Sequence, residues 1–101
     1  MQSYTGAEGE VQKLYQEKTN NCVKWAKIQT GKTGTFGAEG RRGINTQDAR
    51  VGEIGVEAQR YHAVVVVAVN GDMITVIESN FIKNWITQRT LPRLEFMGFI
   101  I

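Results

Sequence analysis

The dipeptide Asn70-Gly71 constrains the fold most, because it stands between two segments rich in Val and Ile, residues 62–69 and 73–77. Both segments have the β-branched composition that favours strands. A two-residue type I′ turn needs positive φ at both central positions, and Asn-Gly is the strongest short sequence signal for such a turn. We therefore predict a β-hairpin with Asn70-Gly71 as its turn.

Three further segments have the composition of strands. They are residues 53–58, 85–91 and 96–101, the last two separated by Pro92. Added to the hairpin, they predict an antiparallel β-sheet of about five strands in the second half of the chain.

The first third of the chain has the pattern of helices. Apolar residues recur at i, i+3 and i+4 within residues 8–18, which predicts a short amphipathic helix. Residues 19–21 offer N-cap side chains for a second helix that begins at Cys22 and stops at Gly31. Five glycines within residues 30–43 predict a loop. This order predicts an α+β fold, with N-terminal helices packed on a C-terminal sheet.

The composition limits the classes of partner. A chain of 101 residues with 42% apolar and 22% charged residues is expected to form one globular domain, residues 1–101. A net charge of +2 is too small to indicate nucleic-acid binding. The longest apolar stretch, residues 63–69, is too short to span a bilayer, and residues 1–18 do not resemble a signal peptide. We therefore expect no nucleic-acid or membrane partner.

Cys22 is the only cysteine, so it cannot form an internal disulfide. At the N-terminus of the predicted helix, the helix dipole and the unpaired backbone N–H groups would favour the nucleophilic thiolate. The same N–H groups could hold an oxyanion. A lone cysteine is also often a small buried apolar residue, and that alternative stays open.

His62 is the only histidine and begins the most hydrophobic predicted strand, where a base could be held rigidly. Counting outward from the predicted turn places Ser79 opposite His62, with Glu78 and Asn80 on either side, and a one-residue bulge would place Glu78 or Asn80 directly opposite. Either neighbour could accept the imidazole N–H and so complete a set of nucleophile, base and orienting group with Cys22. A purely structural histidine is the alternative.

Six short motifs follow one another from about residue 20 to the C-terminus. They are Asn21-Cys22-Val23-Lys24-Trp25-Ala26, Val51-Gly52-Glu53-Ile54, Tyr61-His62-Ala63-Val64-Val65, Val69-Asn70-Gly71-Asp72-Met73-Ile74-Thr75-Val76, Glu78-Ser79-Asn80 and Arg89-Thr90-Leu91-Pro92. As an ordered set they resemble the CHAP family, the cysteine, histidine-dependent amidohydrolases and peptidases.

The resemblance implies a papain-like fold without a cofactor and the hydrolysis of amide bonds in bacterial peptidoglycan. The bond would be the muramoyl to L-alanine amide or a peptide bond, cleaved through a thioacyl intermediate. Cys22 would be the nucleophile and His62 the base, with Glu78 and Asn80 as polar partners. Such a protein would act at the bacterial cell wall, secreted, released by a phage or carried on a virion. It would be a monomer or part of a larger lysin or virion assembly.

Two departures from the family pattern mark candidate substrate-binding residues. Asn21 stands where members often have Gln, and Tyr61 stands where they often have Gly. Trp85 is a third candidate, because it follows the polar corner at residues 79–80. No metal site is expected, because one Cys and one His with scattered carboxylates cannot bind zinc, and no Asp-rich loop precedes Cys22 for calcium.

Two other functions are compatible with the sequence. The first is a catalytically inactive CHAP-like module that serves a structural or wall-binding role, for example in a phage virion. The second and weaker one is a small nucleic-acid-binding protein that uses the basic pair Arg41-Arg42.

Overall fold

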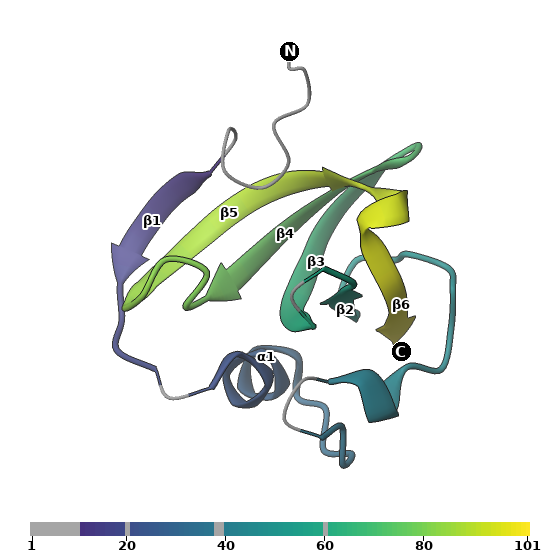
Figure 1. The fold of residues 1–101 in the computed structure, drawn as a ribbon, viewed down its shortest axis with the longest axis horizontal. Helices are drawn as coiled ribbons and strands as arrows, with labels where there is room; N and C mark the ends of the chain where they lie inside the picture. Colours follow the sequence, from purple (N-terminus) through teal and green to yellow (C-terminus); the bar gives the residue numbers. More distant parts are fainter. Residues whose placement is uncertain (1–10, 20, 38–39, 60) are drawn as a thin grey trace.

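The computed structural model describes residues 11–19, 21–37, 40–59 and 61–101. In these residues the chain forms a curved six-stranded antiparallel sheet with one α-helix, α1, packed against it (Figure 1). The elements are β1 (Gln12–Gln16), α1 (Cys22–Thr30), β2 (Ile54–Glu57), β3 (His62–Asn70), β4 (Met73–Ser79), β5 (Trp85–Pro92) and β6 (Phe96–Ile100), with single 3₁₀ turns η1 (Arg41–Gly43) and η2 (Arg93–Glu95). The strand order is β1-β5-β4-β3-β2-β6. No helix in the described part of the chain is long and apolar enough to cross a membrane.

The predicted α+β, papain-like arrangement, with N-terminal helices packed on a C-terminal sheet of about five strands, is wrong, because the described residues form a six-stranded sheet with a single α-helix. The middle of the first predicted helix is β1, which pairs antiparallel with β5 from Gln12↔Gln88 to Gln16↔Trp85, while residues 8–10 lie outside the described residues. Its side chains are exposed, so the helical spacing of apolar residues does not correspond to a buried stripe. Backbone hydrogen bonds to the edge of the sheet replace those of a helix.

The prediction for α1 is confirmed at both ends. Asn21 is the N-cap, and its Oδ1 accepts the Lys24 backbone N–H at 3.0 Å. Gly31 ends the helix at φ +74, a left-handed conformation that glycine adopts without steric cost, and its N–H donates to the Lys27 carbonyl at 2.8 Å. Cys22 is therefore the first helical residue.

The predicted hairpin of β3 and β4 is present, but its turn lies one residue further along the chain. Asn70 pairs with Met73, so Gly71 and Asp72 form the turn, with Gly71 at φ +59. The register then shifts at a bulge in β3 before Val65 pairs with Ile77. The prediction that Ser79 lies opposite His62 is therefore wrong.

The corrected register explains which side chain can reach His62. Continued by one step from Val65↔Ile77, it places Glu78 opposite Val64. Side chains alternate between the faces of a sheet, so His62 shares a face with Val64 and is a diagonal neighbour of Glu78. The register therefore brings Glu78, rather than Ser79, to the imidazole.

Both faces of the sheet carry core residues. The cluster on the face of α1 comprises Val23, Ala26, Phe36, Ile54, Val56, Ala63 and Ile100. The cluster on the other face comprises Val64, Val66, Ile74, Val76, Leu91, Phe96 and Phe99. The second cluster continues along the strands into the charged residues of the site described next.

Candidate active site

Cys22 and His62 meet where α1 and β3 begin. The partly buried Cys22 side chain is hydrogen-bonded to the His62 imidazole, and the backbone N–H groups of Val23 and Ala63 also donate to its sulfur. The Asn21 cap sets the first turn of α1, and β3 starts at His62. Helix end and strand start thus hold a thiol against an imidazole.

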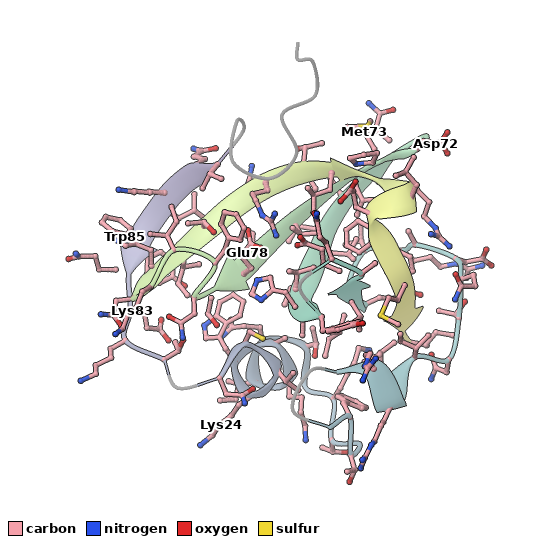
Figure 2. All side chains as sticks on the ribbon, viewed as in Figure 1. Lys24, Asp72, Met73, Glu78, Lys83 and Trp85 are labelled. Atoms are coloured by element: carbon pink, nitrogen blue, oxygen red, sulfur yellow. The ribbon has the colours of Figure 1, made fainter. Side chains whose placement is uncertain are left out.

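Glu78 orients the imidazole from the opposite side. Its Oε1 lies 3.1 Å from His62 Nε2, and the two side chains are 0% and 10% exposed. Figure 2 shows Glu78 in the middle of the molecule, far from Asp72 and Met73 at the tip of the hairpin. Because Nε2 faces the carboxylate, the other ring nitrogen, Nδ1, is left to face the thiol.

The charges of these groups are coupled. Burial by itself raises the pKa of the Cys22 thiol, but the hydrogen bond and the charge of His62 outweigh it and lower that pKa overall. Burial by itself lowers the pKa of His62, but hydrogen bonds from the ring to Cys22 and Glu78, and their negative charges, raise it to about 9. Both shifts favour a thiolate paired with an imidazolium over the neutral pair.

A buried polar network supports Glu78. Arg89 Nε lies 2.8 and 3.0 Å from the two carboxylate oxygens, and Thr87 Oγ1 donates to Oε2 at 3.0 Å. Arg89 Nη2 donates to Glu78 and also to Glu57. The guanidinium carbon of Arg89 lies 3.8 Å from the centroid of the Phe81 ring, and the arginine is only 1% exposed.

Glu57 and Arg89 have no role that could be assigned from the sequence alone. A signal was present: Arg89 shares strand parity with the buried Leu91, so its charge falls on an apolar face and needs a partner. Glu57 ends a strand that is buried at every position. Neither signal identifies the partner, because the two residues come from strands that are not neighbours in the sheet.

Asn80 makes its side-chain hydrogen bonds to groups other than the imidazole. Its Nδ2 donates to the Thr19 carbonyl at 2.8 Å, and its Oδ1 accepts the Asn84 backbone N–H at 3.0 Å. Its φ is +63, which asparagine tolerates better than most residues. Asn80 therefore shapes the turn between β4 and β5 and ties it to the segment before α1, and Glu78 contacts the ring.

The three predicted substrate-binding residues lie in different places. Asn21, next to Cys22, uses its side-chain oxygen for the helix cap. Tyr61 precedes His62, is 41% exposed and stacks under the Arg41 guanidinium at 4.3 Å. Its φ is +51, a left-handed conformation that glycine would adopt at less cost than tyrosine.

Trp85 lies apart from the site. It pairs with Gln16 at the edge of the sheet, and Lys13 Nζ sits 5.0 Å from its ring centroid. Figure 2 shows it beside β1 and near Lys83, well away from Glu78. The structure therefore brings together Cys22, His62 and Glu78, with Tyr61 alongside, and leaves Trp85 outside this group.

Comparison with protein-family models, curated proteins and solved structures finds no match to this chain. In the part of the chain that the structure describes, no group of three or more His, Cys, Asp or Glu side chains could hold a metal ion.

The coupling of Cys22 and His62 predicts a pH dependence that can be measured without knowing the substrate. We expect iodoacetamide to alkylate Cys22 rapidly at pH values well below the ordinary thiol pKa of about 8.5. In His62→Ala the thiolate loses its positive neighbour, so the curve of alkylation rate against pH should move to higher pH. Because Cys22 is the only cysteine, intact-mass measurement reports on this thiol alone. Coincident curves for the two proteins would show that the side chains are not coupled.

Proposed function

We propose that this protein is a cysteine amidohydrolase or peptidase that cleaves amide bonds of bacterial peptidoglycan. The observation that carries the proposal is the chain of contacts from the Cys22 thiol at the start of α1 to the buried imidazole of His62 and on to the carboxylate of Glu78. Acyl transfer needs this combination of nucleophile, base and orienting group. The resemblance to the CHAP family supports peptidoglycan as the substrate and the bacterial cell wall as the place of action.

In the acylation step, the Cys22 thiolate attacks the carbonyl carbon of the amide and forms a C–S bond, while the carbonyl π electrons move to oxygen. Backbone N–H groups at the start of α1 are suited to stabilise this oxyanion. When the tetrahedral intermediate collapses, the C–N bond breaks and the His62 imidazolium gives its proton to the leaving amine. The acyl group remains on sulfur as a thioester.

In the deacylation step, neutral His62 accepts a proton from water as the oxygen adds to the thioester carbonyl. Collapse breaks the C–S bond, releases a carboxylic acid and returns Cys22 to the thiolate. The proton taken from water restores the imidazolium, and the acid loses its own proton to solvent. Glu78 holds the ring in the tautomer and orientation that both steps need. The two steps require no cofactor.

The proposal is tested by incubating the purified chain with purified peptidoglycan and analysing the soluble products by mass spectrometry. Cleavage of the muramoyl amide would release intact stem peptides with a free L-alanine amine, whereas endopeptidase cleavage would release shorter fragments. Chain alkylated with iodoacetamide is the control and should release neither. Folded chain that binds the polymer but releases no fragments would favour the non-catalytic module.

A further inference from the structure

The site contains a buried cation that the two-step chemistry does not use. Arg89 reaches from β5 to the Glu78 carboxylate with Nε and Nη2, and the same Nη2 contacts Glu57 at the end of β2. Glu57 pairs in register with His62, so both acids face the imidazole from its two neighbouring strands. We propose that Arg89 is a positioning residue that keeps Glu78 ionised and fixed against His62, and thereby maintains the thiolate–imidazolium pair.

The two-pronged contact explains why an arginine suits this position. A planar guanidinium matches both oxygens of a carboxylate and fixes its plane, whereas an ammonium acts as a point charge. Thr87 adds a third donor to Glu78, which leaves the carboxylate little freedom to turn away from the ring. The Phe81 ring covers one face of the guanidinium.

Four elements bring titratable or charged groups close to His62. The groups are Cys22 of α1, Glu57 of β2, Glu78 of β4 and Arg89 of β5. Without Arg89, two buried carboxylates would share one region with a single cation, the imidazolium. Both carboxylates contact the same Arg89 nitrogen and therefore lie close together. Repulsion between two such negative charges favours the uptake of a proton by one of them, and desolvation favours it further. A protonated Glu78 would no longer stabilise the imidazolium.

The proposal therefore predicts the sign of a change in the pKa of His62. Removal of a cation with no other consequence would raise the pKa of a nearby imidazole, because the positive ring would lose a repulsive neighbour. If Arg89 keeps Glu78 ionised, its removal instead neutralises the carboxylate and lowers the pKa of His62. If the role of Arg89 were confined to folding, the pKa of His62 would rise or stay unchanged in a variant that remains folded.

The experiment is an NMR titration of the His62 ring in Arg89→Met, and it is unambiguous because the chain has a single histidine. We expect the pKa to fall from about 9 toward the ordinary imidazole value of about 6.5, and Cys22 alkylation to shift to higher pH in parallel. Arg93→Met is the matched control: this arginine donates to the Gln47 carbonyl instead of Glu78, and its loss should leave both curves unchanged. An unchanged or raised pKa of His62 in folded Arg89→Met would overturn the proposal.

If Arg89→Met does not fold, Arg89→Lys provides the test. Lysine retains the buried positive charge but lacks the planar guanidinium that matches both carboxylate oxygens. The pKa of His62 should still fall, by less than in the Met variant, and no change would again contradict the proposal. The inference takes its catalytic meaning from the proposed function, but its readout is a titration. A wild-type chain without hydrolytic activity would refute the proposed function and leave the comparison of pKa values intact.

Discussion

Cys22→Ala is expected to lose hydrolysis of peptidoglycan, with turnover lower by about six orders of magnitude, the cost of removing the nucleophile in a comparable serine triad. The reason is that no C–S bond can form. His62→Ala should lose a similar factor, and the double variant should be no worse than either single one, because groups that act as a unit are not additive. The rate of fragment release, followed by mass spectrometry, measures all three.

Leu94→Ala is the control for this series, because Leu94 lies on η2 and is 78% exposed. Its activity should equal that of the wild type. All variants should unfold cooperatively, so that lost activity is not lost structure. Hydrolysis above a trace in Cys22→Ala would rule out the covalent mechanism.

Glu78→Ala is expected to cost about 3–5 kcal/mol in the free energy of unfolding, because it leaves the Arg89 guanidinium buried with only Glu57 as a carboxylate partner. Removing one member of a buried ion pair costs more than the pair contributes, since the remaining charge is desolvated without compensation. Denaturant titration monitored by tryptophan fluorescence measures the change.

Asp48→Ala is the matched control, because it removes an acid from an exposed ion pair with Arg50, 3.9 Å apart. Its cost should be within about 0.5 kcal/mol. A similar small cost for Glu78→Ala would mean that the buried network does not stabilise the fold.

Glu78→Gln distinguishes the effect of Glu78 on folding from its effect on the orientation of His62. This variant keeps the shape of the side chain, yet we expect a loss of about four orders of magnitude in turnover, as for the orienting acid of a comparable triad.

Local sequence signals sufficed wherever adjacent residues alone set the backbone. The Asn21 side chain caps α1 through an N–H three residues away, and Gly31 ends the helix through its own φ. The start of β3 at His62 follows in the same way from a run of β-branched residues. The positions of the thiol and the imidazole on their elements could therefore be predicted.

The helical periodicity misled the prediction for β1: Val11, Leu14 and Tyr15 have the spacing i, i+3 and i+4, but Leu14 and Tyr15 lie in a strand. The edge of β5 offers a row of backbone hydrogen-bonding partners about 70 positions further along the sequence, and no local pattern records them. The hairpin count failed for a related reason. A bulge near Val66 changes which residue lies opposite His62, and a run of consecutive valines contains nothing that marks where the bulge falls.

The sequence by itself determined a thiol at a helix N-terminus, an imidazole at the start of a strand and an acid on the partner strand, because each depends on neighbouring residues. Only the tertiary structure decided that Glu57, Glu78 and Arg89 form one buried network beside that imidazole. In the strand order, β2 and β5 are three strand spacings apart, about 14 Å in a flat sheet. Figure 1 shows that the sheet is curved. The Arg89 and Glu57 side chains nevertheless meet across the two intervening strands, β3 and β4. A buried charge must find a partner, but which partner it finds depends on strand order and curvature, which the chain acquires only when it folds.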